Sequence, residues 1–163
     1  GYVFGAAGRS IDKDSKLRYI TIMFNDRNNK FFGLDSLDLN KKVYFVEGPL
    51  DSLFLNNSTA FAGSYGNVSE ITDKNKAVIV LDNEPRNKEI VNIMENFIDA
   101  GYTICSWPEN VIEKDINDMV LSGLTCANVR CIINDNLYNG MRAKLRLTQW
   151  RKVWQKKKTK YIL

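Results

Sequence analysis

Histidine is absent from the 163-residue chain. Without an imidazole, the chain cannot carry a Ser-His-Asp or Cys-His nucleophilic site, a His-ligated zinc ion or imidazole acid–base chemistry. Cysteine is scarce as well, because only Cys105, Cys126 and Cys131 carry thiols and no two of them form a CxxC pair. The cysteines therefore predict neither a disulfide framework nor a zinc site, and they favour a reducing compartment.

Long apolar runs are also missing. No run approaches the roughly 20 residues of a membrane-spanning helix, and no charged segment precedes an apolar one at the amino terminus, so we expect no membrane segment. The 44% of hydrophobic and 26% of charged residues are typical of a globular domain. Because the chain begins with Gly1 rather than Met, we expect that it was processed or excised from a longer protein.

Acidic residues are absent from the carboxyl-terminal part of the chain. Residues 142–163 contain nine of the 23 basic residues and no Asp or Glu. The preceding residues hold 14 basic and 19 acidic side chains, which gives them a net charge of −5 against +4 for the whole chain. An acidic body with a basic tail suits a protein that binds metal in one place and a polyanion in another. A solvated basic helix end is the alternative.

Strand and helix patterns alternate from residue 41 onward. Short β-rich runs predict strands, and apolar residues spaced by three and four predict helices. The predicted strands are 43–46, 59–62, 77–81 and 102–107, and the predicted helices are a stretch around 50–54, 86–100 and 115–121. This alternation predicts an α/β fold with a mostly parallel sheet covered by helices on both faces.

Two different segments flank this core. Residues 1–40 hold four of the ten glycines and one apparent strand, Tyr19–Phe24, which we interpret as an isolated strand at the end of an α+β subdomain. Residues 125–160 lack proline and are interpreted as two helices separated at Asn139-Gly140. We therefore predict three parts: 1–40, a central domain at 41–123, and a helical segment with a basic tail at 124–163.

Acidic residues follow three of the predicted strands. Glu47 comes directly after the first strand, Asp82 and Glu84 follow the third, and Asp115 and Asp118 lie after the fourth. Because parallel strands end at the same edge of a sheet, these acids are expected to meet in one cleft. Crowded carboxylates raise one another's pKa unless cations neutralise them. Oxygen ligands alone favour a hard divalent ion, Mg²⁺ or Mn²⁺, and such a site suits phosphoryl or nucleotidyl transfer.

Each acid also has a structural interpretation. An acid after a strand is often a helix N-cap or a solvated loop residue, and Asp51 and Asp118 could be only that. Glu84-Pro85 could simply lead into the helix that begins near Arg86. The presence of acids at three strand ends, rather than at one, favours the metal site.

Several of these segments resemble a known family. Val46-Glu47-Gly48-Pro49-Leu50-Asp51 resembles the first motif of the TOPRIM superfamily, and Asp82-Asn83-Glu84 resembles its second motif, with Glu in place of the last Asp. Lys114-Asp115-Ile116-Asn117-Asp118 is similar to the acidic segment that follows in primases. Gly8-Arg9 and Arg18-Tyr19-Ile20 are similar to elements upstream of it in bacterial-type primases. The combination, from about residue 8 to 151, resembles the DNA primase subunits of T-even-type tailed bacteriophages.

This resemblance implies a TOPRIM domain at 41–123 and a DNA primase activity, in which short RNA primers are made on single-stranded DNA from ribonucleoside triphosphates. It implies Glu47, Asp82 and Glu84 as catalytic metal-site residues, with Asp51, Asp115 and Asp118 as supporting metal-site acids and Mg²⁺ or Mn²⁺ as cofactor. The family's amino-terminal zinc-binding module is absent, so zinc is not expected here. The implied partner is a replicative helicase, and the implied location is the cytoplasm of the infected bacterial host.

Basic residues complete the predicted site. The residues proposed to bind nucleotide or template phosphates are Arg9, Arg18, Lys114, Arg142, Lys144 and Arg146. Arg9 and Arg18 could equally be ordinary surface charges, and Trp150 and Trp154 are interpreted as helix-packing residues. Two other functions use the same features: a TOPRIM-type nuclease, and a catalytically silent module that binds nucleic acid or helicase.

Overall fold

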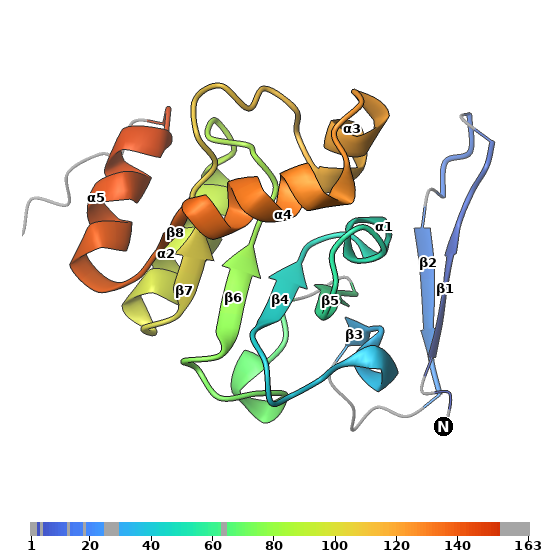
Figure 1. Cartoon of the computed structure of the whole chain (residues 1–163). Helices are drawn as coiled ribbons and strands as arrows, with labels where there is room; N and C mark the ends of the chain where they lie inside the picture. Colours follow the sequence, from blue (N-terminus) through green and yellow to red (C-terminus); the bar gives the residue numbers. More distant parts are fainter. Residues whose placement is uncertain are drawn as a thin grey trace, which may run out of the picture.

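A six-stranded sheet forms the centre of the computed structural model, which describes residues 3, 5–12, 14–17, 19–24, 30–62 and 65–153. The strand order is β3-β5-β4-β6-β7-β8 (Figure 1). The strands are β3 (Phe31–Phe32), β4 (Val43–Val46), β5 (Ser58–Phe61), β6 (Ala77–Val80), β7 (Thr103–Cys105) and β8 (Leu137–Tyr138). The four central strands are parallel, and β3 and β8 add an antiparallel strand at each edge. The predicted mostly parallel α/β sheet is therefore confirmed.

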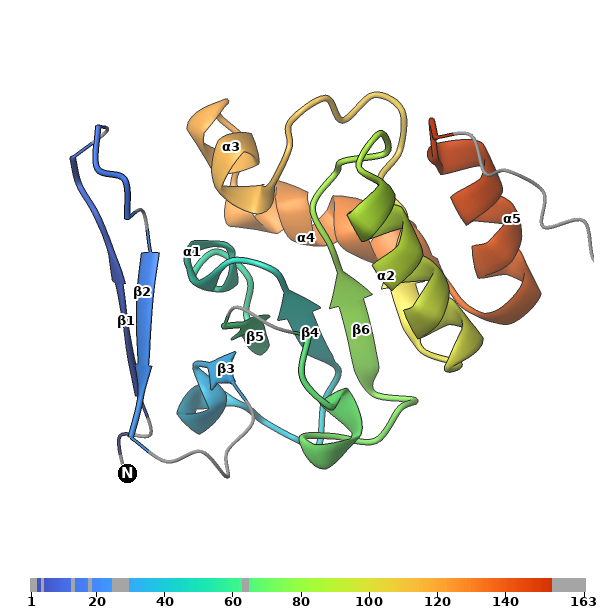
Figure 2. The same cartoon turned by 180° about the vertical axis from the view of Figure 1, so that it is seen from behind.

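Helices cover both faces of this sheet (Figures 1 and 2). They are α1 (Pro49–Ser52), α2 (Lys88–Asp99), α3 (Ile116–Leu121), α4 (Cys126–Asp135) and α5 (Gly140–Trp150), with short 3₁₀ turns η1 (Leu34–Ser36) and η2 (Val68–Glu70). Alternate residues of each strand point to opposite faces. Phe45 and Ile79 pack in the core beneath α2 and α5, and Tyr44 and Val78 pack in the core beneath α3 and α4.

The ends of α2 are set by its flanking residues. The Asn87 side chain accepts a hydrogen bond from the Glu89 backbone N–H, so the helix begins at Lys88 rather than at the predicted Arg86. At the other end, Gly101 adopts a φ of 86°, a left-handed conformation that glycine tolerates and that ends the helix as predicted. Pro85 thus lies in the loop before α2 rather than in its first turn.

The predicted isolated strand at Tyr19–Phe24 is wrong in one respect, because it has a partner. Strand β1 (Gly5–Arg9) pairs with β2 (Tyr19–Met23) in an antiparallel hairpin separate from the main sheet (Figure 1). Strand β1 is glycine- and alanine-rich and therefore lacks the β-branched pattern that marks a strand. A Cβ on Gly5 would lie 2.7 Å from the Ile22 carbonyl oxygen, so this glycine allows the close pairing.

The two helices predicted in 125–160 are confirmed as α4 and α5, but the segment between them is not a simple break. Leu137–Tyr138 forms β8, which pairs antiparallel with β7. Residues 154–163, including Trp154 and the lysine run, lie outside the described residues. In the part of the chain that the structure describes, none of the helices has the length and apolar character needed to cross a membrane. The three-part domain division stays a prediction.

Candidate functional site

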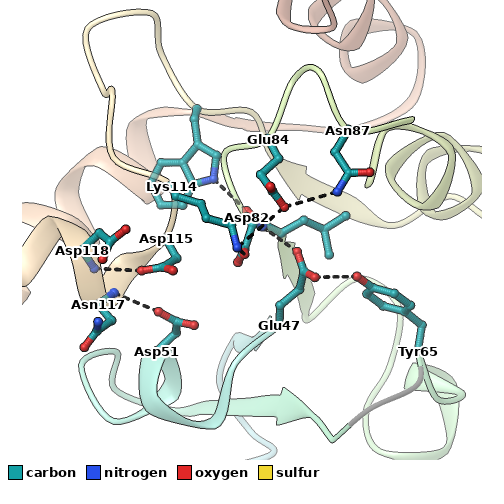
Figure 3. A network of polar contacts seen from close by, with 12 residues as sticks. Glu47, Asp51, Tyr65, Asp82, Glu84, Asn87, Lys114, Asp115, Asn117 and Asp118 are labelled. Carbon is teal, nitrogen blue, oxygen red and sulfur yellow. Dashed lines mark hydrogen bonds and ion pairs between the residues drawn. The ribbon is translucent and has the colours of Figure 1, made fainter. Parts of the chain in front are cut away.

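The acids that follow the strands gather at the carboxyl edge of the sheet (Figure 3). Glu47 directly follows β4, and Asp82 follows β6 after Leu81. Glu47, Asp51, Asp82 and Asp115 line one small pocket between the strand ends and α3. The expectation that separate segments bring these acids together is therefore met by the fold.

Glu47 is held in place through both of its carboxylate oxygens. Its Oε1 accepts a hydrogen bond of 2.7 Å from the Tyr65 hydroxyl, and its Oε2 accepts one of 2.9 Å from the Asp82 backbone N–H. The second bond ties the end of β4 to the end of β6. Because a carboxylate has about four acceptor sites, Glu47 keeps lone pairs free for a cation.

The carboxylates of Asp82 and Glu84 both lie near one ammonium group, that of Lys114. The Lys114 ammonium lies 3.3 Å from Asp82 Oδ2 and 3.9 Å from Glu84 Oε2 (Figure 3). The side chain of Asp82 is only 16% exposed, whereas that of Lys114 is 52% exposed and can move away into solvent. Lys114, predicted to bind nucleotide or template, therefore offsets part of the negative charge of these two acids.

Asn83 lies between these two acids in the sequence, but its side chain bonds to residues outside the acidic cleft and holds the loop after β6 in place. Its backbone N–H donates to the Lys114 carbonyl at 2.6 Å, and its Nδ2 donates to the Val111 and Glu113 carbonyls. Its Oδ1 accepts from the Trp150 indole N–H at 3.1 Å. One amide side chain therefore joins the loop after β6, the loop after β7 and α5.

Asp51, on α1, is almost completely buried with 7% exposure. Its Oδ1 accepts a hydrogen bond of 2.8 Å from the Asn117 backbone N–H in the first turn of α3. The carboxylate lies so close to Gly48 that any Cβ there would collide with its Oδ2, although the φ of Gly48 is an ordinary −96°. A side chain at position 48 would therefore displace the Asp51 carboxylate, so the preference for glycine here comes from space rather than from backbone conformation. Asp51 links α1 to α3 rather than acting as a simple N-cap.

Burial and mutual repulsion raise two pKa values in the cleft. Burial raises the pKa of Asp82 to about 7, and the nearby Glu47 and Asp51 carboxylates add to the effect, against the opposing charge of Lys114. Burial likewise raises the pKa of Asp51 to about 6, with contributions from Asp115 and Glu47. Partial burial lowers the pKa of Lys114, but the neighbouring Asp82 carboxylate outweighs it, so the net pKa is raised. Burial and the neighbouring carboxylates together therefore favour the protonated forms of Asp82 and Asp51, and Lys114 opposes this only in part for Asp82.

The donor set fits a hard divalent cation. It consists of carboxylate oxygens, which Mg²⁺ and Mn²⁺ prefer, and its raised pKa values show a site that gains from added positive charge. Among the described residues, no three His, Cys, Asp or Glu side chains stand close enough together to hold a metal ion. The acids are instead spread along the cleft, with Lys114 between two of them.

The remaining predicted acids, Asp115 and Asp118, lie at the start of α3, and only Asp115 lines the pocket between the strand ends. Asp115 is the N-cap of α3, and its Oδ1 accepts from the Asp118 backbone N–H at 2.8 Å. Asp118 is exposed in the first turn of that helix, at the edge of the group in Figure 3. The capping role considered for Asp118 thus belongs to Asp115, and Asp118 lies farther from the other acids than its place in the sequence suggested.

The predicted basic residues are dispersed. Lys144 forms an ion pair of 2.6 Å with Asp99, at the end of α2 remote from the cleft. The Arg146 guanidinium lies over the Tyr138 ring, 5.0 Å from its centroid, and Arg142 is exposed on the same helix. Arg9 lies on the exposed surface of the hairpin, and Arg18 lies outside the described residues.

Sequence reasoning missed three residues that position the acids: Tyr65, Trp107 and Asn83. The Trp107 indole donates to the Leu81 carbonyl at 2.8 Å and supports the end of β6 from beneath. Tyr65 follows β5 and Trp107 follows β7, so both stand at the same sheet edge as the acids. The strand-end rule could have found them, but it was applied to acidic residues alone.

Comparison with known proteins supports the predicted resemblance. No family model matches the chain. Over 148 residues, or 90% of its length, the chain is 34% identical to the DNA primase of Enterobacteria phage T4. The fold resembles the crystal structure of the Aquifex aeolicus primase, comprising its zinc-binding and RNA polymerase domains. That likeness covers 83% of the chain, with a TM-score of 0.60 and 22% identity.

The resemblance to phage DNA primases is thereby confirmed in sequence, and the α/β fold is confirmed in structure. The similar region is only part of each relative. The chain spans 43% of the phage T4 primase and 37% of the Aquifex chain.

Proposed function

We propose that the chain is the catalytic, RNA-polymerising domain of a phage-type DNA primase, with a TOPRIM domain at 41–123. It would make short RNA primers on single-stranded DNA from ribonucleoside triphosphates. The observation that carries the proposal is the 34% identity with a phage DNA primase over 90% of the chain. The cluster of acids within the matched length supplies chemistry suited to that reaction.

Glu47, Asp82 and Glu84 would hold the divalent metal, Mg²⁺ or Mn²⁺, with Asp51, Asp115 and Asp118 as supporting acids. When bound, the metal would supply positive charge to the triphosphate and lower the pKa of the attacking 3′-hydroxyl. No side-chain nucleophile is required, in agreement with the absence of histidine. The hydrogen bonds from Tyr65 and from the Asp82 backbone would orient the Glu47 carboxylate toward the cleft.

Lys114 would have two positions. In the structure it pairs with Asp82 and Glu84, and a bound divalent cation would repel it from them. Its flexible four-carbon stem would then carry the ammonium toward the triphosphate or template phosphates. Arg9, Arg18, Arg142, Lys144 and Arg146 remain proposed phosphate-binding residues. The replicative helicase remains the proposed partner, and the host cytoplasm the proposed location.

Primer synthesis tests the function directly. The chain is incubated with end-labelled single-stranded DNA, labelled ribonucleoside triphosphates and Mg²⁺ or Mn²⁺, and the products are resolved on a denaturing gel. We expect short RNA products that require the metal and disappear in Asp82→Asn and Glu47→Gln. Asp73→Asn, a matched change at an exposed position before β6, should retain synthesis.

The same gel separates the other functions. Shortened DNA without RNA products would identify a nuclease that uses the same acids. Intact DNA without RNA products, together with retained DNA binding, would identify a silent binding module. Normal synthesis by Asp82→Asn would show that the acid cleft is not the catalytic site.

A further inference from the structure

A second cavity lies beside the acidic cleft and differs from it in charge. It has a volume of about 290 Å³ and lies between the loop after β6, the loop after β7 and α5. Trp107 lines both cavities and separates them. Along the segment 82–86, Asp82 and Glu84 meet Lys114 in the cleft, whereas Asn83, Pro85 and Arg86 line the second cavity.

The walls of this cavity are held by specific bonds. The Trp150 indole N–H donates to Asn83 Oδ1 at 3.1 Å, and the Lys152 backbone N–H donates to the Pro85 carbonyl at 2.7 Å. Both bonds join the end of α5 to the loop that carries the acids. The packing of α5 beside α2 is visible in Figure 2. The cavity is therefore part of the fold rather than a gap between loosely placed loops.

Cationic side chains surround an apolar floor in this cavity. Arg86, Arg146 and Lys152 line it together with one carboxylate, Glu109, so the lining carries a net charge of about +2. In the part of the chain that the structure describes, neither Arg86 nor Lys152 forms an ion pair. The apolar lining, called the floor here, consists of Pro85, Pro108, Val111 and Ile112 with the small exposed parts of Trp107 and Trp150.

Arg146 gives a second indication of an anionic ligand. Its guanidinium lies against the Tyr138 ring, and one terminal N–H donates to Gln149 Oε1 at 3.2 Å. Its Nε–H is buried and has no hydrogen-bond partner among the described residues. Because this Nε atom has almost no accessible surface, only the terminal N–H groups of the half-buried guanidinium face a ligand in the cavity, and a phosphate oxygen is the acceptor that guanidinium groups bind most strongly.

We propose that this cavity binds a free nucleoside triphosphate, with the phosphates against Arg86, Arg146 and Lys152 and the nucleoside on the apolar floor. A phosphate ion alone would satisfy the cations and leave the floor uncovered, whereas a nucleotide has both an anionic and an apolar end. The volume of about 290 Å³ lies just below the roughly 300–1,000 Å³ of ligand pockets, so a bound nucleotide would extend partly into solvent. This site is separate from the metal cleft, and it assigns Arg146, proposed above to bind nucleotide or template phosphates, to a nucleotide held away from the metal.

Binding of ATP without metal tests the proposal. Equilibrium dialysis of the 163-residue chain with labelled ATP in EDTA and low salt removes any contribution from metal in the acidic cleft. We expect saturable binding that weakens about tenfold in Arg86→Gln and in Arg146→Gln. Arg130→Gln makes the same change at an exposed position on α4, outside the cavity, and this variant should bind ATP as tightly as the unmodified chain.

Competitors identify the ligand class. Adenosine and tripolyphosphate should each compete at least about tenfold more weakly than ATP. Adenosine lacks the anionic phosphates that bind the cations, and tripolyphosphate lacks the nucleoside that covers the apolar floor. A thymidine oligonucleotide should displace ATP from this site no better than adenosine does. Binding of the oligonucleotide here in place of ATP would overturn the free-nucleotide proposal.

The test is independent of primer synthesis. Asp82→Asn should lose synthesis but retain ATP binding in EDTA, so failure of one proposal leaves the other standing. Arg146→Gln also loses its contact with Tyr138, so thermal unfolding is measured beside Arg86→Gln, whose side chain is exposed. No saturable ATP binding, or equal binding by Arg86→Gln, Arg146→Gln and Arg130→Gln, would overturn the proposal.

Discussion

At the scale of single residues, the carboxyl of Asp82 combines burial with neighbouring negative charge. Its side chain is 16% exposed, and the Glu47 and Asp51 carboxylates act on it from nearby. The pKa in the folded state is raised to about 7 from an ordinary value of 3.8. Between these values the folded protein holds a proton that the unfolded chain has released. The free energy of unfolding must therefore fall as the pH rises through this window.

Asp82→Asn removes the part of this dependence that is due to Asp82, and the raised pKa of Asp51 leaves a smaller part in place. In EDTA, we expect the variant to be more stable than the unmodified chain near neutral pH, by on the order of 2 kcal/mol, and about equal to it near pH 4. Urea unfolding followed by circular dichroism at a series of pH values measures the difference. Asp118→Asn, at an exposed position, should leave the profile unchanged. An unmodified chain whose stability does not fall toward neutral pH would contradict the electrostatic account of the cleft.

Lys114 is expected to compete with the metal for the same carboxylates. Removing a unit charge about 4 Å from the site changes a divalent cation's binding by at least about 1 kcal/mol, or about fivefold. Lys114→Met should therefore bind Mn²⁺ at least about fivefold more tightly while losing primer synthesis. Mn²⁺ titration followed by electron paramagnetic resonance gives the affinity. Lys144→Met, which breaks an ion pair away from the cleft, serves as the control for Mn²⁺ affinity and should leave it unchanged. Weaker Mn²⁺ binding by Lys114→Met would show that Lys114 helps to form the site.

At the scale of elements, Asn83 holds two loops and a helix in one arrangement. Its side chain bonds to the loop after β7 through the Val111 and Glu113 carbonyls and to α5 through Trp150. Asn83→Ala would leave these partly buried groups unpaired. We expect a loss of about 1–3 kcal/mol in unfolding free energy and a fall in Mn²⁺ affinity, because the flanking acids lose their positions.

The control for Asn83→Ala is Asn92→Ala, which removes an exposed amide from the surface of α2. Guanidinium unfolding and the Mn²⁺ titration are measured on both variants. Unchanged Mn²⁺ affinity in a destabilised Asn83→Ala would mean that the loop's backbone bond to Lys114 is enough to place the acids.

At the scale of the whole molecule, charge is divided along the chain. The net charge of −5 before residue 142 includes the acids of the cleft, and all nine later charges are positive. Deleting residues 155–163 removes four of these lysines, in a segment outside the described residues. The logarithm of the affinity for single-stranded DNA, plotted against the logarithm of salt concentration, should lose slope by up to about 0.7 per lost phosphate contact.

Fluorescence anisotropy of a labelled oligonucleotide across a salt series gives this slope for the full chain and for the truncated chain. The truncation should leave Mn²⁺ affinity unaltered, because all the acids proposed to hold the metal lie before residue 119 in the sequence. Equal slopes for the full and truncated chains would show that the terminal lysines do not contact DNA, and binding to helicase would then be measured instead.

The sequence alone was sufficient to predict the class of fold and the acidic residues that meet at the edge of the sheet. Alternating apolar runs predicted the parallel strands, because burial on both faces requires continuous hydrophobic residues such as Ala77–Leu81. The strand-end rule then placed Glu47 and Asp82 at one edge, because parallel strands all end on the same side. Strands β1, β3 and β8 could not be predicted, because they are very short or poor in β-branched residues and are stabilised by their partners.

Only the tertiary structure decided what surrounds these acids. Tyr65 reaches Glu47 from 18 positions away, and Trp150 reaches Asn83 from 67 positions away, and no local pattern encodes such contacts. Within one loop, Asn83 and Arg86 line the cationic cavity whereas Asp82 lines the acidic cleft. This division depends on the path of the loop between the elements packed on either side of it. Periodicity records which residues are buried, but the partners of a buried polar group are fixed only when separate segments pack together.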